Sequence, residues 1–193
     1  EQTMLVAKNN ILLQSAQNKR EWDNDSSDSK VAIGASFNIG SQNGFTLDLG
    51  AQLAKSMGTG SDLTQVNSTL DTGLLVLRSG QDTTLKGAQV RAETLKADIG
   101  GNLNIASQQD ESTQKNRQTS GGFGGSICVP PFCIGDPVTV SANIAASKMN
   151  SNFAAVTDQS GLFAGQGGYD IHVGGTTRLD GAVIASDATA DKN

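Results

Sequence analysis

The sequence contains few of the residues on which catalytic and metal sites depend. Its single histidine, His172, excludes any site that needs two histidines. Its two cysteines supply only two of the four ligands of a structural zinc site. Only three of the 193 residues are proline and 4% are aromatic, so the core must be made of small and branched aliphatic side chains. We therefore expect no enzyme, no cofactor and no metal site.

Basic residues and long apolar segments are also scarce. The chain has 14 lysines and arginines against 19 acidic residues, a net charge of -5, whereas nucleic-acid-binding domains present a basic surface. We expect no nucleic-acid partner. Residues 1–13 lack the features of a secretion signal, and no apolar run approaches the ~20 residues of a membrane-spanning helix. Because neither end carries a recognisable terminal feature, we expect a segment of a longer protein.

The two cysteines enclose Val-Pro-Pro-Phe, between Cys128 and Cys133. This spacing differs from the Cys-x-x-Cys of redox sites. We expect a local structural disulfide at a loop tip, and two free thiols are the alternative. A disulfide would fit a protein that folds outside the cytoplasm.

The sequence repeats itself at long range. The segment that starts at Leu75 (LVLRSGQDTTLKGA) matches the one that starts at Tyr169 (YDIHVGGTTRLDGA), 94 residues later. The segment that starts at Leu103 (LNIASQQD) matches the one at Ile11 (ILLQSAQN), at an offset of 92. The difference of two residues predicts a small insertion near Gln166-Gly167. The chain therefore holds about two copies of one long unit.

One part of each copy contains short apolar pairs whose members lie two residues apart, so that both point to one face of a strand. The pairs are Leu75/Leu77, Thr83/Leu85, Ala88/Val90, Leu95/Ala97 and Leu103/Ile105, separated by polar residues or by Gly73, Gly80, Gly87 and Gly100-Gly101. Three such strands take about 20 residues, the size of one solenoid coil. This pattern of short apolar pairs predicts a right-handed parallel β-helix with glycine at the corners.

The other part of each copy alternates over longer stretches. Apolar side chains recur at every second residue through 31–39, 45–53, 123–129 and 138–146. Asn43-Gly44 is a strong hairpin-turn signal. Proline does not continue a strand ladder, which places Pro130-Pro131 and the cysteines at the turn of the second copy. We expect two long antiparallel hairpins projecting from the β-helix, although Ala51–Met57 is also compatible with a helical turn.

These expectations define one all-β repeat array. Its parts are the end of a coil at 1–25, a hairpin at 26–66, coils at 67–107, a second hairpin at 108–156 and further coils at 157–193. The alternating strands resemble membrane-inserting hairpins, so their apolar face is the candidate membrane- or partner-facing surface. The alternative is that this face packs on its own stem. The candidate residues are Val31, Ile33, Phe37, Ile39, Phe45, Leu47, Leu49, Ile127, Val129, Val138, Val140 and Ile144.

The string Leu77-Arg-Ser-Gly-Gln-Asp-Thr-Thr-Leu-Lys-Gly-Ala88, followed by Asp98-Ile-Gly-Gly-Asn-Leu-Asn-Ile-Ala-Ser-Gln-Gln-Asp110, resembles the repeats of filamentous haemagglutinin-like proteins. It is most similar to the second repeat block of contact-dependent growth inhibition effectors. The resemblance implies a filamentous exoprotein on the surface of a Gram-negative cell, exported through an outer-membrane two-partner transporter. It further implies association with the target-cell outer membrane or its proteins, contacts with neighbouring repeats, and help in delivering a C-terminal toxin. The cysteine pair is not part of that repeat pattern.

Two other functions are alternatives to toxin delivery. One is a passive adhesin stalk whose repeats only set filament length. The other is a polysaccharide-active enzyme, which needs a pair of carboxylates. Asp23, Asp25, Asp28, Asp110 and Glu111 are close in sequence but lie in Ser/Asn-rich stretches that are typical of solvated segments. His172 has no nucleophile near it in the sequence, so we expect it on a strand surface.

Overall fold

The computed structural model describes residues 1–40 and 42–193, and almost all of them lie in β-strands. One short 3-10 helix, Ala190–Lys192, ends the described chain. The strands are β1 (Gln2–Ala7), β2 (Ile11–Gln14), β3 (Ala16–Asn38), β4 (Gln42–Val66), β5 (Ser68–Ser79), β6 (Thr83–Lys86), β7 (Ala88–Ile99), β8 (Leu103–Ala106), β9 (Asp110–Gly135), β10 (Val138–Ala155), β11 (Gly161–Val173), β12 (Thr177–Asp180) and β13 (Val183–Ser186).

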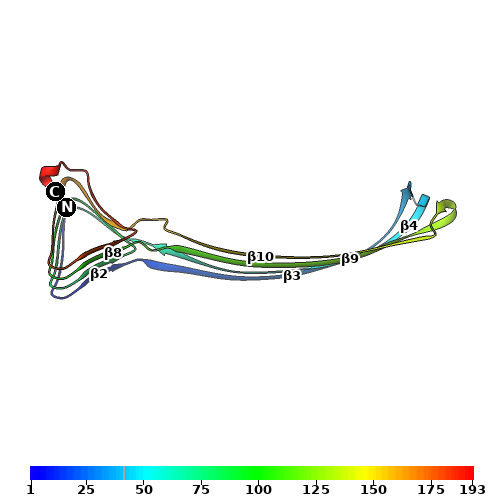
Figure 1. The fold of residues 1–193 in the computed structure, drawn as a ribbon, viewed down its shortest axis with the longest axis horizontal. Helices are drawn as coiled ribbons and strands as arrows, with labels where there is room; N and C mark the ends of the chain where they lie inside the picture. The colour runs from blue at the N-terminus through cyan, green and yellow to red at the C-terminus, as the bar shows by residue number, and fades with distance from the viewer. Residues whose placement is uncertain (41) are drawn as a thin grey trace. The chain divides into compact units, whose positions relative to one another are not determined.

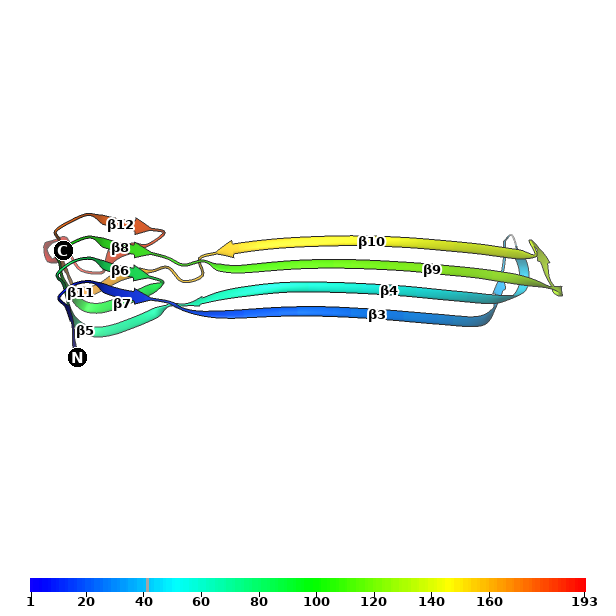
Figure 2. The same cartoon turned by 90° about the horizontal axis from the view of Figure 1, so that it is seen from below.

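These strands fall into two compact units (Figure 1). The parallel unit comprises 1–20, 62–112 and 153–193, and the long-strand unit comprises 21–61 and 113–152. The parallel unit has a five-stranded sheet in the order β1-β5-β7-β11-β13 and a four-stranded sheet in the order β12-β8-β6-β2. Their paired strands run parallel. Figure 2 shows β6, β8 and β12 side by side. Two stacked parallel sheets fit a β-helix.

The strand register explains the long sequence repeat. Gln2 pairs with Leu74, 72 positions later, and Ser68 pairs with Ala88, 20 positions later. The step of 72 positions and the step of 20 positions add up to the 92-residue offset of the sequence repeat. Ile11 pairs with Thr83, which pairs with Leu103, so the matching segments at Ile11 and Leu103 occupy the same register two coils apart. The sequence period is therefore the period of the stack.

The predicted two-residue insertion is a bulge in β11. Opposite β7, Ala164 pairs with Ala92, but the next pair is Gly168 with Thr94, so β11 uses extra residues there. Gly168 has a φ of +73°, a conformation that glycine adopts without strain. The bulge absorbs the insertion, and the later pairs Tyr169–Leu95 and Val173–Ile99 keep the core positions in register.

The core lies between the two sheets of the parallel unit. All the apolar pairs predicted from the sequence are buried, and Leu75, Leu85, Ala88 and Val90 are fully excluded from solvent. The hydroxyl of Thr83 is buried as well and forms a hydrogen bond of 2.8 Å with that of Ser79, so the polar group does not lose its partner. The period-two pattern thus identified the core correctly.

The coil is simpler than the sequence predicts. We expected three short strands in each coil, but the structure has two, because Ala88/Val90 and Leu95/Ala97 belong to one continuous strand, β7. Gly73, expected between strands, lies inside β5 for the same reason. A Cβ on Gly73 would lie 2.8 Å from the carbonyl oxygen of Glu1, so the glycine permits close approach of the neighbouring coil.

The long-strand unit is built on a sheet in the order β10-β9-β4-β3 (Figure 2). The Phe37 and Phe45 rings are 5.2 Å apart in an edge-to-face arrangement, whereas Lys55 reaches Asp25 at 3.9 Å. The two residues of the Asp25–Lys55 contact are farther apart in the sequence than Phe37 and Phe45, so the separation grows away from the β3–β4 connection. This pattern comes from neighbouring strands that run in opposite directions. Residues 51–57 belong to β4, so the helical alternative is wrong.

The connections in this sheet differ from the prediction. Asn43 and Gly44 lie within β4 rather than in a turn, and Ser41 of the expected Gly40–Gly44 turn is outside the described residues. The Asn43 side-chain oxygen accepts a hydrogen bond of 2.8 Å from the Gly40 N–H. A Cβ on Gly44 would lie 2.1 Å from the carbonyl oxygen of Phe132 in β9. Gly44 also has a φ of +120°, so glycine is required both by its backbone conformation and by the neighbouring strand.

The cysteines and prolines also lie in a strand. Cys128, Pro130, Pro131 and Cys133 belong to β9, which continues to Gly135, so their expected position at the turn is wrong. The connection to β10 is Asp136-Pro137. Proline lacks an N–H and cannot donate to a neighbouring strand, and the Cys128 N–H, two residues before Pro130, donates to the Pro137 carbonyl at 3.0 Å.

Candidate interaction face

The long-strand sheet separates apolar from polar side chains onto two faces. Odd-numbered residues of β3 and β4 share one face, on which Phe37 meets Phe45. Even-numbered residues share the other, on which the hydroxyls of Ser36 and Thr46 lie 3.1 Å apart. We call the first the apolar face and the second the polar face. The alternation follows from the two-residue period of a strand.

β9 and β10 continue the same division. The Ser126 hydroxyl of β9 bonds to Gln42 of β4 and to Thr139 of β10, which places all three on the polar face. The alternate residues Ile127, Val138 and Val140 therefore belong to the apolar face. A hydrogen-bonded order of β10-β9-β4-β3 makes each face continuous across four strands.

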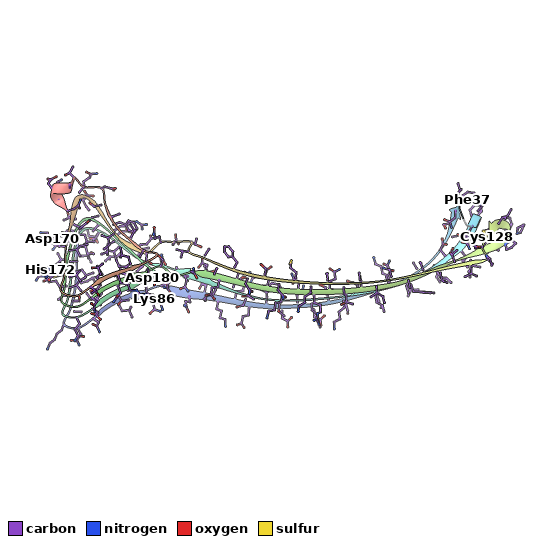
Figure 3. All side chains as sticks on the ribbon, viewed as in Figure 1. Phe37, Lys86, Cys128, Asp170, His172 and Asp180 are labelled. Atoms are coloured by element: carbon purple, nitrogen blue, oxygen red, sulfur yellow. A yellow bond between two sulfur atoms is a disulfide. The ribbon has the colours of Figure 1, made fainter. Side chains whose placement is uncertain are left out.

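Two polar residues near the tip of the sheet are buried, whereas the apolar face is exposed. Gln42 and Thr46 of the polar face are only 3% and 2% exposed. The candidate residues of the apolar face are all open to solvent, from 39% for Ile127 to 88% for Ile39. The structure thus brings the candidate residues of four strands together on one surface, uncovered by the described residues. Figure 3 labels Phe37 in this part of the sheet.

The polar face is held together by side-chain hydrogen bonds. The Asn38 amide donates to Ser36 and Thr46, at 3.1 and 2.7 Å, and the Gln42 amide donates to the Asp136 carbonyl at 2.6 Å. These bonds satisfy polar groups that packing removes from water. The tip of the sheet is consequently ordered by its polar face and leaves the apolar face free.

A shallow groove of about 510 Å³ crosses the apolar face. Leu53 of β4 and Ile144 of β10 line it, together with the small residues Ser29, Thr119 and Gly121 and the charged residues Asp28 and Lys55. Lys55 also forms an ion pair with Asp25 at 3.9 Å. Along the second half of β3 and the residue that follows it, the apolar face from Ser29 to Ile39 has no charged side chain. The apolar face therefore combines an uncharged apolar stretch with a groove that also contains charged side chains.

The structure joins Cys128 and Cys133 by a disulfide with a Cα–Cα distance of 5.3 Å. Both are nearly buried, with exposures of 7% and 3%. Sequence reasoning missed two exposed apolar residues of this stretch, Phe132 and Ile134, at 68% and 78%. Their spacing of two residues is the signal that could have found them, but the expected turn concealed it.

Trp22 is a second feature that the sequence did not place. Its indole lies over two glycines of β4, because a Cβ on Gly60 would be 2.3 Å from Trp22 Cε2 and one on Gly58 would be 3.2 Å from Cζ3. Asn116 of β9 also reaches Gly58. The Gly-x-Gly spacing at 58 and 60 was the sequence signal for this contact, and it fixes the faces of β3 and β4 in this part of the sheet.

The remaining candidates lie on surfaces. His172 is exposed on β11, where it lies beside Asp98 of β7, and Asp170 is near it (Figure 3). Asp23, Asp25 and Asp28 are exposed in β3, and Glu111 is exposed in β9. Lys86 and Asp180 occupy matching register positions of β6 and β12, on either side of Ala106.

Asp110 differs from these carboxylates. Its Oδ2 accepts a hydrogen bond from the Thr157 hydroxyl, and its Oδ1 accepts one from the Gln65 N–H at 2.6 Å. The Thr157 bond, followed by the Gln65 bond, holds the pKa of Asp110 below its ordinary value. A carboxylate stabilised in its charged form is suited to a structural bond between β4 and β9 rather than to proton transfer.

Among residues 1–40 and 42–193, no helix is both long and apolar enough to cross a bilayer.

Two stacked parallel sheets and a sequence period that equals the period of the stack together define a repeat array, and its long-strand unit carries an exposed apolar face. The hemagglutinin repeat model matches residues 1–121, so the chain belongs to the hemagglutinin repeat family. Members of this family are secreted exoproteins on the surface of Gram-negative bacteria, and the chain is accordingly assigned there.

Similar proteins include large toxins of contact-dependent inhibition. The chain is 44% identical to the tRNA nuclease CdiA of Escherichia coli O6:K15:H31, over 99% of its own length. It is 43% identical to the deoxyribonuclease CdiA of Dickeya dadantii and 41% identical to that of Yersinia pseudotuberculosis, over 98% and 99% of the chain. The chain spans 6%, 6% and 17% of these relatives. No solved structure matches it.

Proposed function

We propose that the chain is a non-catalytic translocation segment that associates with the target-cell outer membrane and helps to deliver a C-terminal toxin. The observation that carries the proposal is the exposed apolar face of the long-strand unit, which has no charged side chain along Ser29–Ile39. Monomeric soluble proteins rarely leave such a face uncovered, and a large exposed apolar patch marks a site for a membrane or a partner. Transfer of these side chains into lipid would stabilise the bound state.

The nuclease names belong to relatives of which this chain matches a small part. What supports a non-enzymatic role is the match to a repeat model and the exposed position of the candidate carboxylates. By the same resemblance we propose that the partners are the two-partner transporter during export, then neighbouring repeats and the target cell. A passive adhesin stalk is the alternative, and it does not require an uncovered apolar face.

The finer architecture is also proposed. The parallel stacking supports a right-handed β-helix in segments 1–25, 67–107 and 157–193. The four-stranded sheet supports two long antiparallel hairpins at 26–66 and 108–156. An experimental structure of the chain at near-atomic resolution would test the handedness, the hairpins and these boundaries together.

The membrane proposal is tested by co-sedimentation of the chain with outer-membrane vesicles and with liposomes of the same phospholipids. We expect binding, and protection of 26–64 and 109–156 from protease while 67–107 stays cleavable. The double variant Ile33→Glu/Ile144→Glu places two charges on the apolar face and should abolish binding, because a charge in the bilayer is costly. Ala32→Glu/Ala145→Glu adds the same charge on the polar face and is the matched control.

Binding that both double variants retain, or no binding by the unmodified chain at any lipid composition, would overturn the membrane proposal. In either case the adhesin stalk becomes the better account of the repeats.

A further inference from the structure

A group of basic side chains lies beside the apolar stretch of the long-strand sheet. The Ser126 and Thr139 hydroxyls lie 2.6 Å apart, which fixes the register between β9 and β10. Carried along these two continuous strands, the register places Arg117 of β9 opposite Lys148 of β10. Both side chains are exposed, and the alternation of a strand puts them on the apolar face with Ile127.

The strand on the other side of β9 is β4. A Cβ on Gly58 would lie 2.7 Å from Asn116 Oδ1, so the adjacent residues Met57 and Arg117 lie opposite each other on the apolar face. Arg117 therefore has a strand of this chain on each side. The segments around it, 55–59, 115–119 and 146–150, contain four basic residues and no acidic one. We call these four the basic patch: Lys55, Lys115, Arg117 and Lys148.

The positive charges of this patch are largely unpaired. Like charges that lie directly opposite each other on neighbouring strands destabilise a sheet, and Arg117 has Lys148 opposite it and Lys115 two residues away. Within 1–40 and 42–193, these three side chains form no ion pair, whereas Lys55 lies 3.9 Å from the carboxylate of Asp25. The whole chain carries a net charge of -5, so the patch is a local excess of positive charge.

The basic patch borders the apolar part of the same face. The groove of about 510 Å³ is lined by Lys55 of the patch and by the apolar side chains of Leu53 and Ile144. Asp28 also lines the groove, but it belongs to β3, which β4 separates from β9. The surface thus offers apolar side chains and, next to them, positive charges that an anion would neutralise.

Phosphate is the anion that these side chains suit. The Arg117 guanidinium has parallel N–H donors that match two phosphate oxygens, and the lysine ammonium groups add positive charge. Lysine and arginine also lay their apolar stems along an apolar surface while the charged ends stay in water. A phospholipid satisfies both parts of the surface, because its phosphate is joined to long acyl chains. Free phosphate would leave the apolar neighbours without a role.

We propose that the basic patch binds the phosphate groups of anionic phospholipids while the adjacent apolar side chains contact the acyl chains. This inference rests on the proposed function, since it names the lipid chemistry that the same face recognises. It adds one requirement to membrane association. Anionic lipid should raise the affinity of the chain, and salt should reduce that gain by screening.

The test is co-sedimentation of the chain with phosphatidylcholine vesicles and with vesicles that also contain phosphatidylglycerol, which is anionic. Arg117→Gln/Lys148→Gln removes two charges from the patch and should fold like the parent, because both side chains are exposed. The parent should bind the anionic vesicles more tightly. The variant should lose roughly 30-fold of that affinity and keep the parent's affinity for phosphatidylcholine vesicles.

The matched control is Arg78→Gln/Lys96→Gln, which removes the same two charges from exposed positions of β5 and β7. It should keep the preference for anionic vesicles. Equal losses in both double variants would overturn the inference, because net charge alone would then explain the attraction. So would abolition of the preference by millimolar inorganic phosphate at constant ionic strength, which would indicate a site for free phosphate.

Failure of this inference is distinguishable from failure of the membrane proposal. Equal binding of the parent to both kinds of vesicle would overturn the phosphate site and leave membrane association in place. No binding of the parent to either kind of vesicle would overturn both. Far-UV circular dichroism of each variant checks that a loss of binding does not come from a loss of strand structure.

Discussion

Asp110 is held by two hydrogen bonds from distant parts of the sequence, Gln65 and Thr157. Both bonds favour the charged carboxylate, which is why its pKa is lowered. A lowered pKa in the folded state adds stability that is fully present above the pKa of the unfolded chain. That stability is lost as the pH falls through the folded pKa.

Thr157→Val removes the first of these bonds and should raise the pKa of Asp110, which NMR titration of the carboxyl measures. The variant should be less stable than the parent at neutral pH, and the difference should shrink as the pH falls below about 4. Thr157→Ser keeps the hydroxyl and should behave like the parent. A difference in unfolding free energy that does not change with pH would show that the bond to the charged carboxylate contributes nothing.

The corner before the second sheet is stabilised by a ladder of side chains from successive coils. Asn10 accepts a bond from the Asp82 N–H at 3.0 Å, and Asp82 accepts one from the Asn102 N–H at 2.7 Å. Asn102 in turn accepts from the Thr176 N–H at 2.9 Å. Each side chain thus replaces the backbone partner that a corner residue lacks, and the corner residues of adjacent coils stay in register.

Asn102→Ala interrupts this ladder in the middle and leaves the Thr176 N–H without its side-chain acceptor. We expect a loss of about 1–2 kcal/mol in the free energy of unfolding, measured by urea denaturation. Asn104→Ala removes an amide from β8, two residues away, and should cost less. If both substitutions have equal effects, the ladder does not set the stability of the corner.

For the whole chain, the buried apolar core and the exposed apolar surface lie in different units. The apolar core of the described residues lies in the parallel unit, around residues such as Leu75, Leu95 and Ile105. The long-strand unit instead exposes its largest apolar side chains and buries polar ones such as Thr46. A substitution should therefore change either folding or association, according to the unit in which it lies.

Leu95→Ala should lower the free energy of unfolding by about 3 kcal/mol, because it leaves a cavity in a closed core. Ile33→Glu/Ile144→Glu should change it by no more than about 0.5 kcal/mol per site, since these residues are 72% and 87% exposed. Thermal and urea unfolding compare the two on the same scale. A large destabilisation by the double variant would mean that the apolar face packs on a stem, as the alternative to membrane binding holds.

The sequence by itself determined the core positions, the repeat and the two-residue insertion, and it assigned the apolar candidates to one face of their strands without deciding whether that face is covered. These features follow from spacings along the chain. A period of two assigns each side chain to a face, and a period of 92 assigns each segment to a coil. The alternation of apolar and polar residues is therefore sufficient to identify Leu75, Leu85 and Leu103 as buried.

Only the tertiary structure decided how the segments meet. Asn43-Gly44 and Pro130-Pro131 carry turn signals, yet both lie in strands, because β4 and β9 run together where Gly44 meets Phe132. The indole of Trp22 over Gly58 and Gly60, and the two bonds to Asp110, likewise join residues far apart in the chain. Local propensity cannot encode such contacts, because they exist only after strands far apart in the sequence pair side by side.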